Sequence, residues 1–126
     1  MRKLPSIDAA QVDMVLKRLS ETNQDIVGVL VISSEGLMLT GRIPKNMDED
    51  LASAVFTALG SIAQRVSQQI ELGNVIQLIM FSEKGGVLIR CGKKSSLVVL
   101  MKPDANLGLI LMDVMKVIKE IEDVLG

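Results

Sequence analysis

Three short segments of this chain, Ile26–Ile32, Leu78–Phe81 and Leu97–Met101, are apolar without interruption. The first is a β-branched run, which favours a strand. A strand with one face in water alternates apolar and polar residues, and these segments do not alternate. Both faces of the sheet must therefore be covered, so helices are needed on two sides of it. The pattern predicts a three-layer α+β domain.

The remaining segments complete a series of eight elements in the order α-β-β-α-β-β-β-α. Turn residues at Ser33–Gly36 predict a hairpin, and turns at Ser82–Gly85 and Gly92–Ser95 predict a meander of three strands. Together they make a five-stranded, mostly antiparallel sheet. The expected strands are Ile26–Ile32, Leu37–Arg42, Asn74–Phe81, Gly86–Cys91 and Ser96–Lys102, and the expected helices are Ile7–Thr22, Leu51–Ile70 and Leu107–Leu125.

Capping residues mark the ends of the helices. Ser6 and Asn106 stand at the N-cap positions of the first and last helices, and Asn46 with Glu49 has the spacing of a capping box before the middle one. Gly73 is a natural left-handed terminator for the middle helix. These signals set the expected bounds of the three helices.

The middle helix carries a single charged side chain, Arg65, between Leu51 and Ile70. Apolar residues form one stripe at helical spacing: Leu51, Val55, Ala58, Leu59, Ile62 and Val66. The opposite face holds small, neutral residues, whereas an ordinary surface helix exposes Lys and Glu. We expect the apolar stripe to pack on the sheet of its own chain. We expect the small, neutral face to contact a second subunit.

The strand after this helix supports the same expectation. Hairpin and meander connections leave Leu37–Arg42 and Asn74–Phe81 as the outermost strands, and the second of these contains no charge and no proline. An unprotected edge strand aggregates unless another strand pairs with it. The sequence therefore predicts a two-fold homodimer. The expected interface residues are Ser53, Phe56, Thr57, Gly60, Ser61, Ala63, Gln64, Ser67, Gln68, Asn74, Val75, Ile76, Gln77, Leu78 and Ile79.

Composition narrows the class of protein. A chain of 126 residues with 48% hydrophobic residues is expected to form one domain over residues 1–126, with a core of its own. The net charge of −1 attracts no polyanion, and Phe56 and Phe81 are the only aromatic residues. Nucleic-acid binding is therefore not expected, because it relies on basic stripes or stacking aromatics.

The compartment expected from the sequence is the cytoplasm. Cys91 is the only cysteine, so no internal disulfide forms, as in a reducing compartment. The first residues lack the apolar segment of a signal peptide. Three glutamines and Arg65 lie within the middle helix, which makes direct membrane insertion costly.

The residues of catalysis are scarce, and no enzyme, metal site or cofactor is expected. There is no histidine, which removes the commonest general base and the usual zinc ligands. Cys91 lies in an apolar strand and is interpreted as a buried structural residue. Asp48, Glu49 and Asp50 suit the positive end of a helix dipole better than acid/base work. The methionines, including Met112 and Met115, are expected to fill the core.

Three local patterns resemble the roadblock / dynein light chain (roadblock/LC7-type) domain family. Asp25–Leu37 is similar to the first hairpin of that family, with Glu35 where Asp is often found before the turn glycine. Ile70–Gly73 precedes a strand of the family type, and Asn106–Gly108 opens the final helix. The ordered set spans nearly the whole chain.

The resemblance implies a profilin-like sandwich that dimerises through its middle helix and third strand. Members of this family are non-enzymatic adaptors: subunits of motor complexes, scaffolds on membranes and regulators of small Ras-like GTPases. The resemblance brings no catalytic motif with it. It implies a homodimer that binds a small Ras-like GTPase and acts on GTP hydrolysis by positioning the switch regions.

Two alternatives stay open at this point. The chain is also compatible with a structural subunit of a larger motor-like or scaffold complex without GTPase regulation, which needs the same dimer and binding surface. The other alternative is a small-molecule sensing domain, which needs an internal pocket with convergent polar groups. The polar candidates in the strands for such a pocket are Thr40, Gln77 and Arg90.

Overall fold

The computed structural model describes residues 6–125. The element order predicted from the sequence is confirmed, and the largest difference in bounds is at the third strand, expected from Asn74, which begins at Gln77. The elements are α1 (Ser6–Thr22), β1 (Ile26–Ser33), β2 (Met38–Arg42), α2 (Glu49–Gln69), β3 (Gln77–Ser82), β4 (Gly85–Cys91), β5 (Ser95–Met101) and α3 (Leu107–Leu125).

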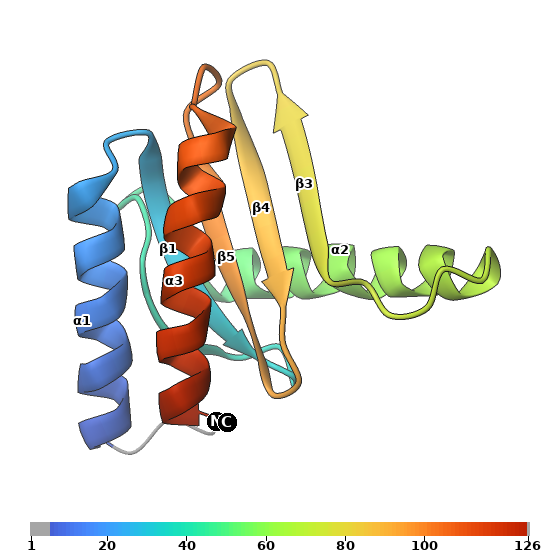
Figure 1. Ribbon diagram of the computed structural model, residues 1–126, viewed down its shortest axis with the longest axis horizontal. Coiled ribbons are helices and arrows are strands. Elements are labelled where there is room, and N and C mark those ends of the chain that lie inside the picture. Colours follow the sequence, from blue (N-terminus) through green and yellow to red (C-terminus); the bar gives the residue numbers. More distant parts are fainter. Residues whose placement is uncertain (1–5, 126) are drawn as a thin grey trace.

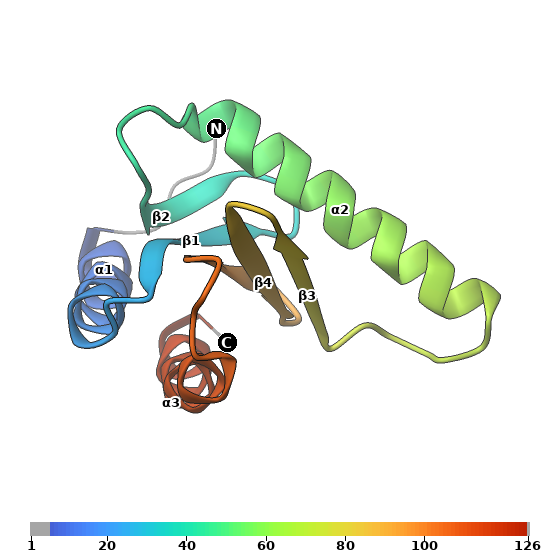
Figure 2. The same ribbon diagram turned by 90° about the horizontal axis from the view of Figure 1, so that it is seen from above.

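The five strands form one sheet in the order β2-β1-β5-β4-β3. Every neighbouring pair is antiparallel, and β2 and β3 are the outermost strands, as expected. The two halves of the sheet meet where β1 pairs with β5, with Leu30 opposite Val98. Helices α1 and α3 lie side by side on one face, and α2 crosses the other (Figures 1 and 2). The predicted three-layer α+β sandwich is confirmed.

The core has two parts, one on each face of the sheet. Beneath α1 and α3 it includes Leu16, Val99 and Val114, all fully buried. Beneath α2 it includes Leu30, Ile32, Ile89, Val98 and Leu100, with Phe56 and Leu59 of α2 packed against them. Apart from Val27, which is exposed, the apolar runs of β1 and β5 are therefore buried on both sides, which is the physical reason for their lack of alternation. The third run differs, because Ile79, Met80 and Phe81 are exposed, so the expectation that both of its faces are covered was wrong.

The orientation of α2 is the reverse of the one expected. Ser53 and Ser67 are buried at 4% and 8% exposure, whereas Leu51 and Val66 of the apolar stripe are 63% and 53% exposed. Of the stripe, Leu59 alone is half-buried against the sheet, while Ala58 is exposed with the rest. The expectation was wrong because helical periodicity separates two faces without saying which neighbour covers each of them.

Helix ends follow the predicted chemistry with some shifts. Asn106 caps α3, since its Oδ1 accepts a hydrogen bond from the Leu109 backbone N–H at 3.1 Å. For α2 the capping residue is Asp48 rather than Asn46, and its Oδ1 accepts from the Leu51 N–H at 3.1 Å. Ser6 is already helical, and the cap expected from its side chain lies outside the described part of the chain.

The end of α2 is also more complex than a single glycine stop. The helix ends at Gln69, and the first left-handed residue after it is Glu71, with φ +60°. Gly73 follows with φ +81°, so it keeps the left-handed conformation expected of it. Two left-handed residues so close together turn the chain back toward the sheet before β3 begins.

Candidate functional site

The residues expected at a subunit interface lie in different environments. Ser53 and Ser67 are buried in the chain itself, so their expected place on an outward face is wrong. Half-buried residues are Phe56, Thr57, Gly60, Ala63, Gln64, Val75, Gln77 and Leu78, and exposed ones are Ser61, Gln68, Asn74, Ile76 and Ile79.

Large aliphatic residues are exposed along the outer face of α2, which also exposes Arg65 and Gln68. Leu51, Val55, Ile62 and Val66 of the helix and Ile70 at its C-cap are each at least half exposed. Leu72 and Ile76 in the segment that follows are 71% and 64% exposed. A contiguous apolar surface of this kind on a small domain marks an interaction site. The apolar stripe in the sequence indicated this surface, but we expected the stripe to pack on the sheet of its own chain.

Helix α2 is longer than its own sheet is wide. Its 21 residues span about 31 Å at about 1.5 Å per residue. Five strands at a spacing of about 4.8 Å span about 19 Å. Figure 2 shows the consequence: the C-terminal part of α2 projects beyond β3, the outermost strand. We call residues 65–76, the end of α2 and the connection to β3, the overhang.

Two side chains of α2 hold the overhang in shape. The Gln64 Oε1 accepts a hydrogen bond from the Val75 backbone N–H at 3.1 Å. The Ser67 hydroxyl donates to the Gly73 carbonyl at 2.7 Å. These bonds tie the connection to the helix, and they explain why polar residues are found at positions 64 and 67. The overhang therefore presents its aliphatic side chains from a defined backbone.

The edge strand β3 adds a second uncovered surface next to the overhang. Its outer edge has no neighbouring strand in the sheet, and Met80 and Phe81 are 43% and 48% exposed. No residue of β3 is charged or a proline. Natural edge strands usually carry such protective residues, so this edge is open to pairing with another strand.

A shallow apolar groove lies on the same face of the sheet as α2. Its volume is about 300 Å³, and its aliphatic lining includes Val27, Met80, Val87 and Leu100. Met47, just before α2, also lines it. The groove, the overhang and the β3 edge each expose large apolar side chains that no other part of residues 6–125 covers.

The acidic and polar residues considered for chemistry have structural roles or lie apart. Asp48 caps α2, as its position suggested. Arg90 donates to Gln77 across the β3–β4 pair at 3.4 Å, while Thr40 is on β2 at the opposite edge of the sheet. The three therefore do not converge on one pocket. Within residues 6–125, no group of three or more His, Cys, Asp and Glu side chains is arranged to hold a metal ion.

Two further expectations for single residues were wrong. Cys91 is half-buried rather than fully buried, and burial raises the pKa of its thiol, against smaller lowering effects of Ser96 and Arg90. Met112 and Met115 do not fill the core; they are 61% and 57% exposed on α3. None of the helices in the described chain combines the length and apolarity needed to cross a membrane.

Comparison with known proteins places this geometry in a family. The uncharacterized protein MJ0714 of Methanocaldococcus jannaschii is 33% identical over 101 residues, which is 80% of this chain and 85% of that protein. MglB from Myxococcus xanthus has a similar fold, with a TM-score of 0.88 at 14% identity, over 97% of this chain and 92% of that one. An MglB structure with a tetrameric arrangement gives 0.87 at 15% identity, over 96% and 92%.

The profilin-like character of the fold is confirmed by a chain of the LokiProfilin1–rabbit actin complex. It matches with a TM-score of 0.63 at 15% identity, over 91% of this chain and 96% of that chain. The model of the family described as the Roadblock/LC7 domain matches residues 11–101. That match includes the whole of α2 and β3, the elements that carry the exposed apolar surfaces. The protein is a member of the Roadblock/LC7 domain family.

Proposed function

We propose that this protein is a non-catalytic homodimeric adaptor that binds and regulates a small Ras-like GTPase. The observation that carries the proposal is the apolar overhang of α2 beside an unprotected edge strand, in a chain of the Roadblock/LC7 family. The dimer and the GTPase are separate steps of the argument. Each has its own surface and its own test.

The dimer is supported by three uncovered surfaces of the chain that can pair between two copies: the β3 edge, the overhang and the groove beside Met80 and Val87. A two-fold axis beside β3 would pair the two β3 edges in one continuous sheet. The same axis would carry the overhang of each copy across to the other, where the groove beside Met80 and Val87 is open. Such a contact covers Val66, Ile70 and Leu72, each more than half exposed in its own chain. It would bury on the order of 1,200–2,000 Å² in total.

The GTPase is assigned to a different part of α2. Leu51 and Val55 lie at the N-terminal end of the helix, over their own sheet and away from the overhang. Together with Met47 and Phe56 they line a second apolar groove of about 410 Å³. Leu51 and Val55 stay exposed in the proposed dimer, and an aliphatic side chain of a GTPase switch region fits this groove by shape and polarity.

The test is an affinity capture in two nucleotide states. The protein is immobilised and exposed to native lysate with GDP or with a non-hydrolysable GTP analogue. We expect a Ras-like GTPase, identified by mass spectrometry, to be recovered preferentially in one of the two states. The purified GTPase is then tested for a change in its hydrolysis or exchange rate on addition of this protein.

A substitution links the capture to the proposed groove. Val55→Lys should weaken recovery of the GTPase by at least about tenfold, or about 1.4 kcal/mol, because it places a charge in an apolar contact. Met14→Lys is the control, since Met14 is exposed on α1, on the opposite face of the sheet. Recovery of some other protein, equally in both nucleotide states, would favour the structural-subunit alternative and end the GTPase proposal.

A further inference from the structure

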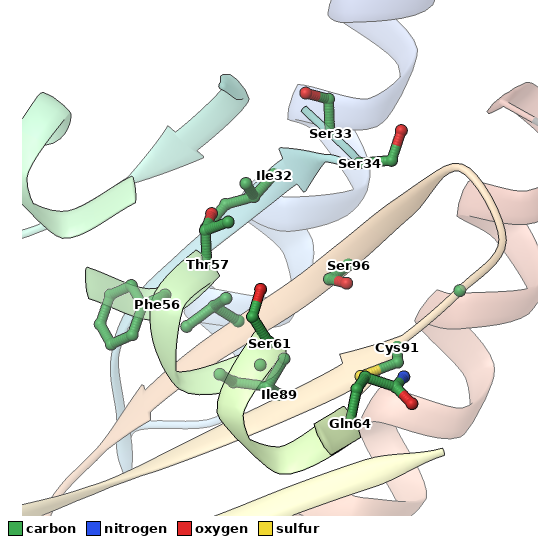
Figure 3. A pocket seen from close by; sticks show the side chains of 13 residues that line it. Ile32, Ser33, Ser34, Phe56, Thr57, Ser61, Gln64, Ile89, Cys91 and Ser96 are labelled. Atoms are coloured by element: carbon green, nitrogen blue, oxygen red, sulfur yellow. The ribbon is translucent and has the colours of Figure 1, made fainter. Parts of the chain in front are cut away.

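A second kind of opening lies between α2 and the sheet, at the end where β1 and β4 finish. Its volume is about 210 Å³, the space of about seven waters at about 30 Å³ each. Figure 3 shows how its walls come from four elements: Ser61 and Gln64 from α2, Ile32 from β1, Cys91 from β4 and Ser96 from β5. None of the polar residues considered for a pocket from the sequence, Thr40, Gln77 and Arg90, lines this cavity.

The cavity exists because α2 turns its small residues inward. An ordinary amphipathic helix would continue its large apolar residues along this face, but beyond Phe56 the α2 residues that line the cavity are Thr57, Gly60, Ser61 and Gln64. A Cβ added at Gly60 would have no atom within 4 Å outside the backbone of its own helix. The core on this face is therefore incomplete where close packing would leave no void.

The lining combines an apolar floor with an uncharged polar rim. Ile32, Ile89 and Val98 form its apolar floor, and serines 33, 34, 61 and 96 also line it. The Ser33 hydroxyl accepts a hydrogen bond from the Leu37 N–H at 3.2 Å, which leaves the other three serines for a ligand. The Gln64 Oε1 is engaged by Val75, so its amide nitrogen remains as a donor. The Thr57 hydroxyl is buried against Gly36 and has no hydrogen-bond partner among the described residues. A threonine in a helix has two accessible χ1 rotamers, so rotation can turn this hydroxyl toward the cavity.

We propose that this cavity binds a small uncharged heterocycle, of the size and chemistry of a nucleobase. Such a molecule has apolar faces for the isoleucine and valine floor and donors and acceptors on its edge for the serine and glutamine rim. This pattern of a mostly apolar wall with a few polar groups is typical of ligand sites. No residue of β3 lines the site, and it shares one lining residue, Phe56, with the groove at Val55. A ligand at this site requires neither the dimer nor the GTPase.

Other ligand classes fit the lining less well. No residue of the lining carries a charge, so an ion would lose its hydration without gaining a partner. A polyol is polar on all sides, and its hydroxyls would lie unpaired over the floor of Ile32, Ile89 and Val98. An aliphatic molecule would leave the serine rim without partners.

Ligand binding in the cavity can be measured through the reactivity of Cys91, because it is the only cysteine of the chain and it lines the cavity wall. The intact protein is alkylated with iodoacetamide, with adenine, cytosine or uracil at millimolar concentration. Alkylation is followed at alkaline pH, since burial raises the pKa of Cys91 and the thiolate is the reactive form. A base that occupies the cavity at ten times its Kd should slow alkylation about elevenfold by mass action.

Gly60→Leu and Ala58→Leu provide the matched pair of variants. Leucine at position 60 fills the cavity and should abolish protection, whereas Ala58 is on the exposed face of the same helix and its change should leave protection intact. An NMR titration of the unmodified chain is a second readout that needs no variant. Amide signals of Ser34, Ser61 and Ser96 should shift with the base.

The outcomes separate the ligand classes. Protection by at least one base, lost in Gly60→Leu and kept in Ala58→Leu, supports the proposal. Equal protection by ribitol or by inorganic phosphate would overturn the assignment to an uncharged heterocycle. If no base slows alkylation or shifts these amide signals at millimolar concentration, the cavity holds only water and the proposal is wrong.

Discussion

At the scale of single residues, Gly36 shows how one position joins the hairpin to α2. Its φ is +87°, a conformation that costs an L-residue about 1–2 kcal/mol. A Cβ at this position would also lie 3.2 Å from the Thr57 Oγ1, closer than ordinary contact allows. The turn at the end of β1 is thus packed directly beneath α2. Glycine is needed here for two independent reasons.

We predict that Gly36→Ala lowers the free energy of unfolding by about 2–3 kcal/mol, from backbone strain and the contact with Thr57. Gly73→Ala is the matched control, because Gly73 has φ +81° but no atom within 4 Å of its added Cβ. That change should cost only the strain, about 1–2 kcal/mol. Urea denaturation measures both. Equal losses would show that the approach of Thr57 to Gly36 has no energetic consequence.

At the scale of elements, α2 departs from the usual rule that a helix turns its large apolar side to its own core. Ser53, Gly60 and Ser67 follow each other every seven residues along the buried face. Small side chains leave the cavity beneath the helix and room for the bonds of Gln64 and Ser67 to the overhang. The aliphatic face is then available for other molecules. The helix is built as an interaction element more than as a core element.

Gly60→Ala tests whether anything approaches the middle of α2. Since an added Cβ has no atom within 4 Å, the change should stabilise the chain by about 0.5–1 kcal/mol through helix propensity alone. Thermal and urea unfolding give the value. A loss of stability would mean that atoms of the sheet lie against Gly60 in solution, so that the cavity beside it is smaller than about 210 Å³.

At the scale of the whole molecule, the two edge strands of the sheet differ, because β2 is protected against pairing with another strand and β3 is not. The β2 edge ends in Gly41 and Arg42, with Pro44 close behind, and the Arg42 guanidinium donates to Asp13 at 3.0 Å. The β3 edge has no such protection, and the overhang of α2 extends past it. The asymmetry of the two edges favours a closed assembly of two copies over a monomer or an open chain.

Two valines of α2 test this assembly with the same substitution. Val66→Lys places a charge in the proposed contact and should raise the dimer Kd by at least about tenfold. Val55→Lys, in a residue of nearly equal exposure (50% against 53%) over its own sheet, should leave the dimer intact. Sedimentation across a range of concentrations measures both. Dissociation of the dimer by Val55→Lys and not by Val66→Lys would show that the interface lies at the N-terminal end of α2.

The architecture and most of the element bounds were predictable from the sequence, because they depend on local signals. Continuous apolar runs such as Ile26–Ile32 require a sheet covered on both faces, and turn residues such as Ser33–Gly36 set the strand order. The cap at Asn106 was read correctly from a single residue. The cap of α2 was not, since Asn46, Asp48 and Glu49 all suit a helix start and only the backbone path selects Asp48.

The sequence by itself determined the eight elements, their layers and the two faces of α2. The tertiary structure decided which of those faces is turned inward, and with it the exposed stripe of Leu51 and Val66 and the cavity beside Gly60. The physical reason is that periodicity records which side chains avoid water, while the neighbour that excludes the water can belong to the same chain or to another molecule. Which neighbour excludes the water depends on the length of α2 relative to the width of the sheet and on the direction in which the helix crosses it. Both are defined only in the folded chain.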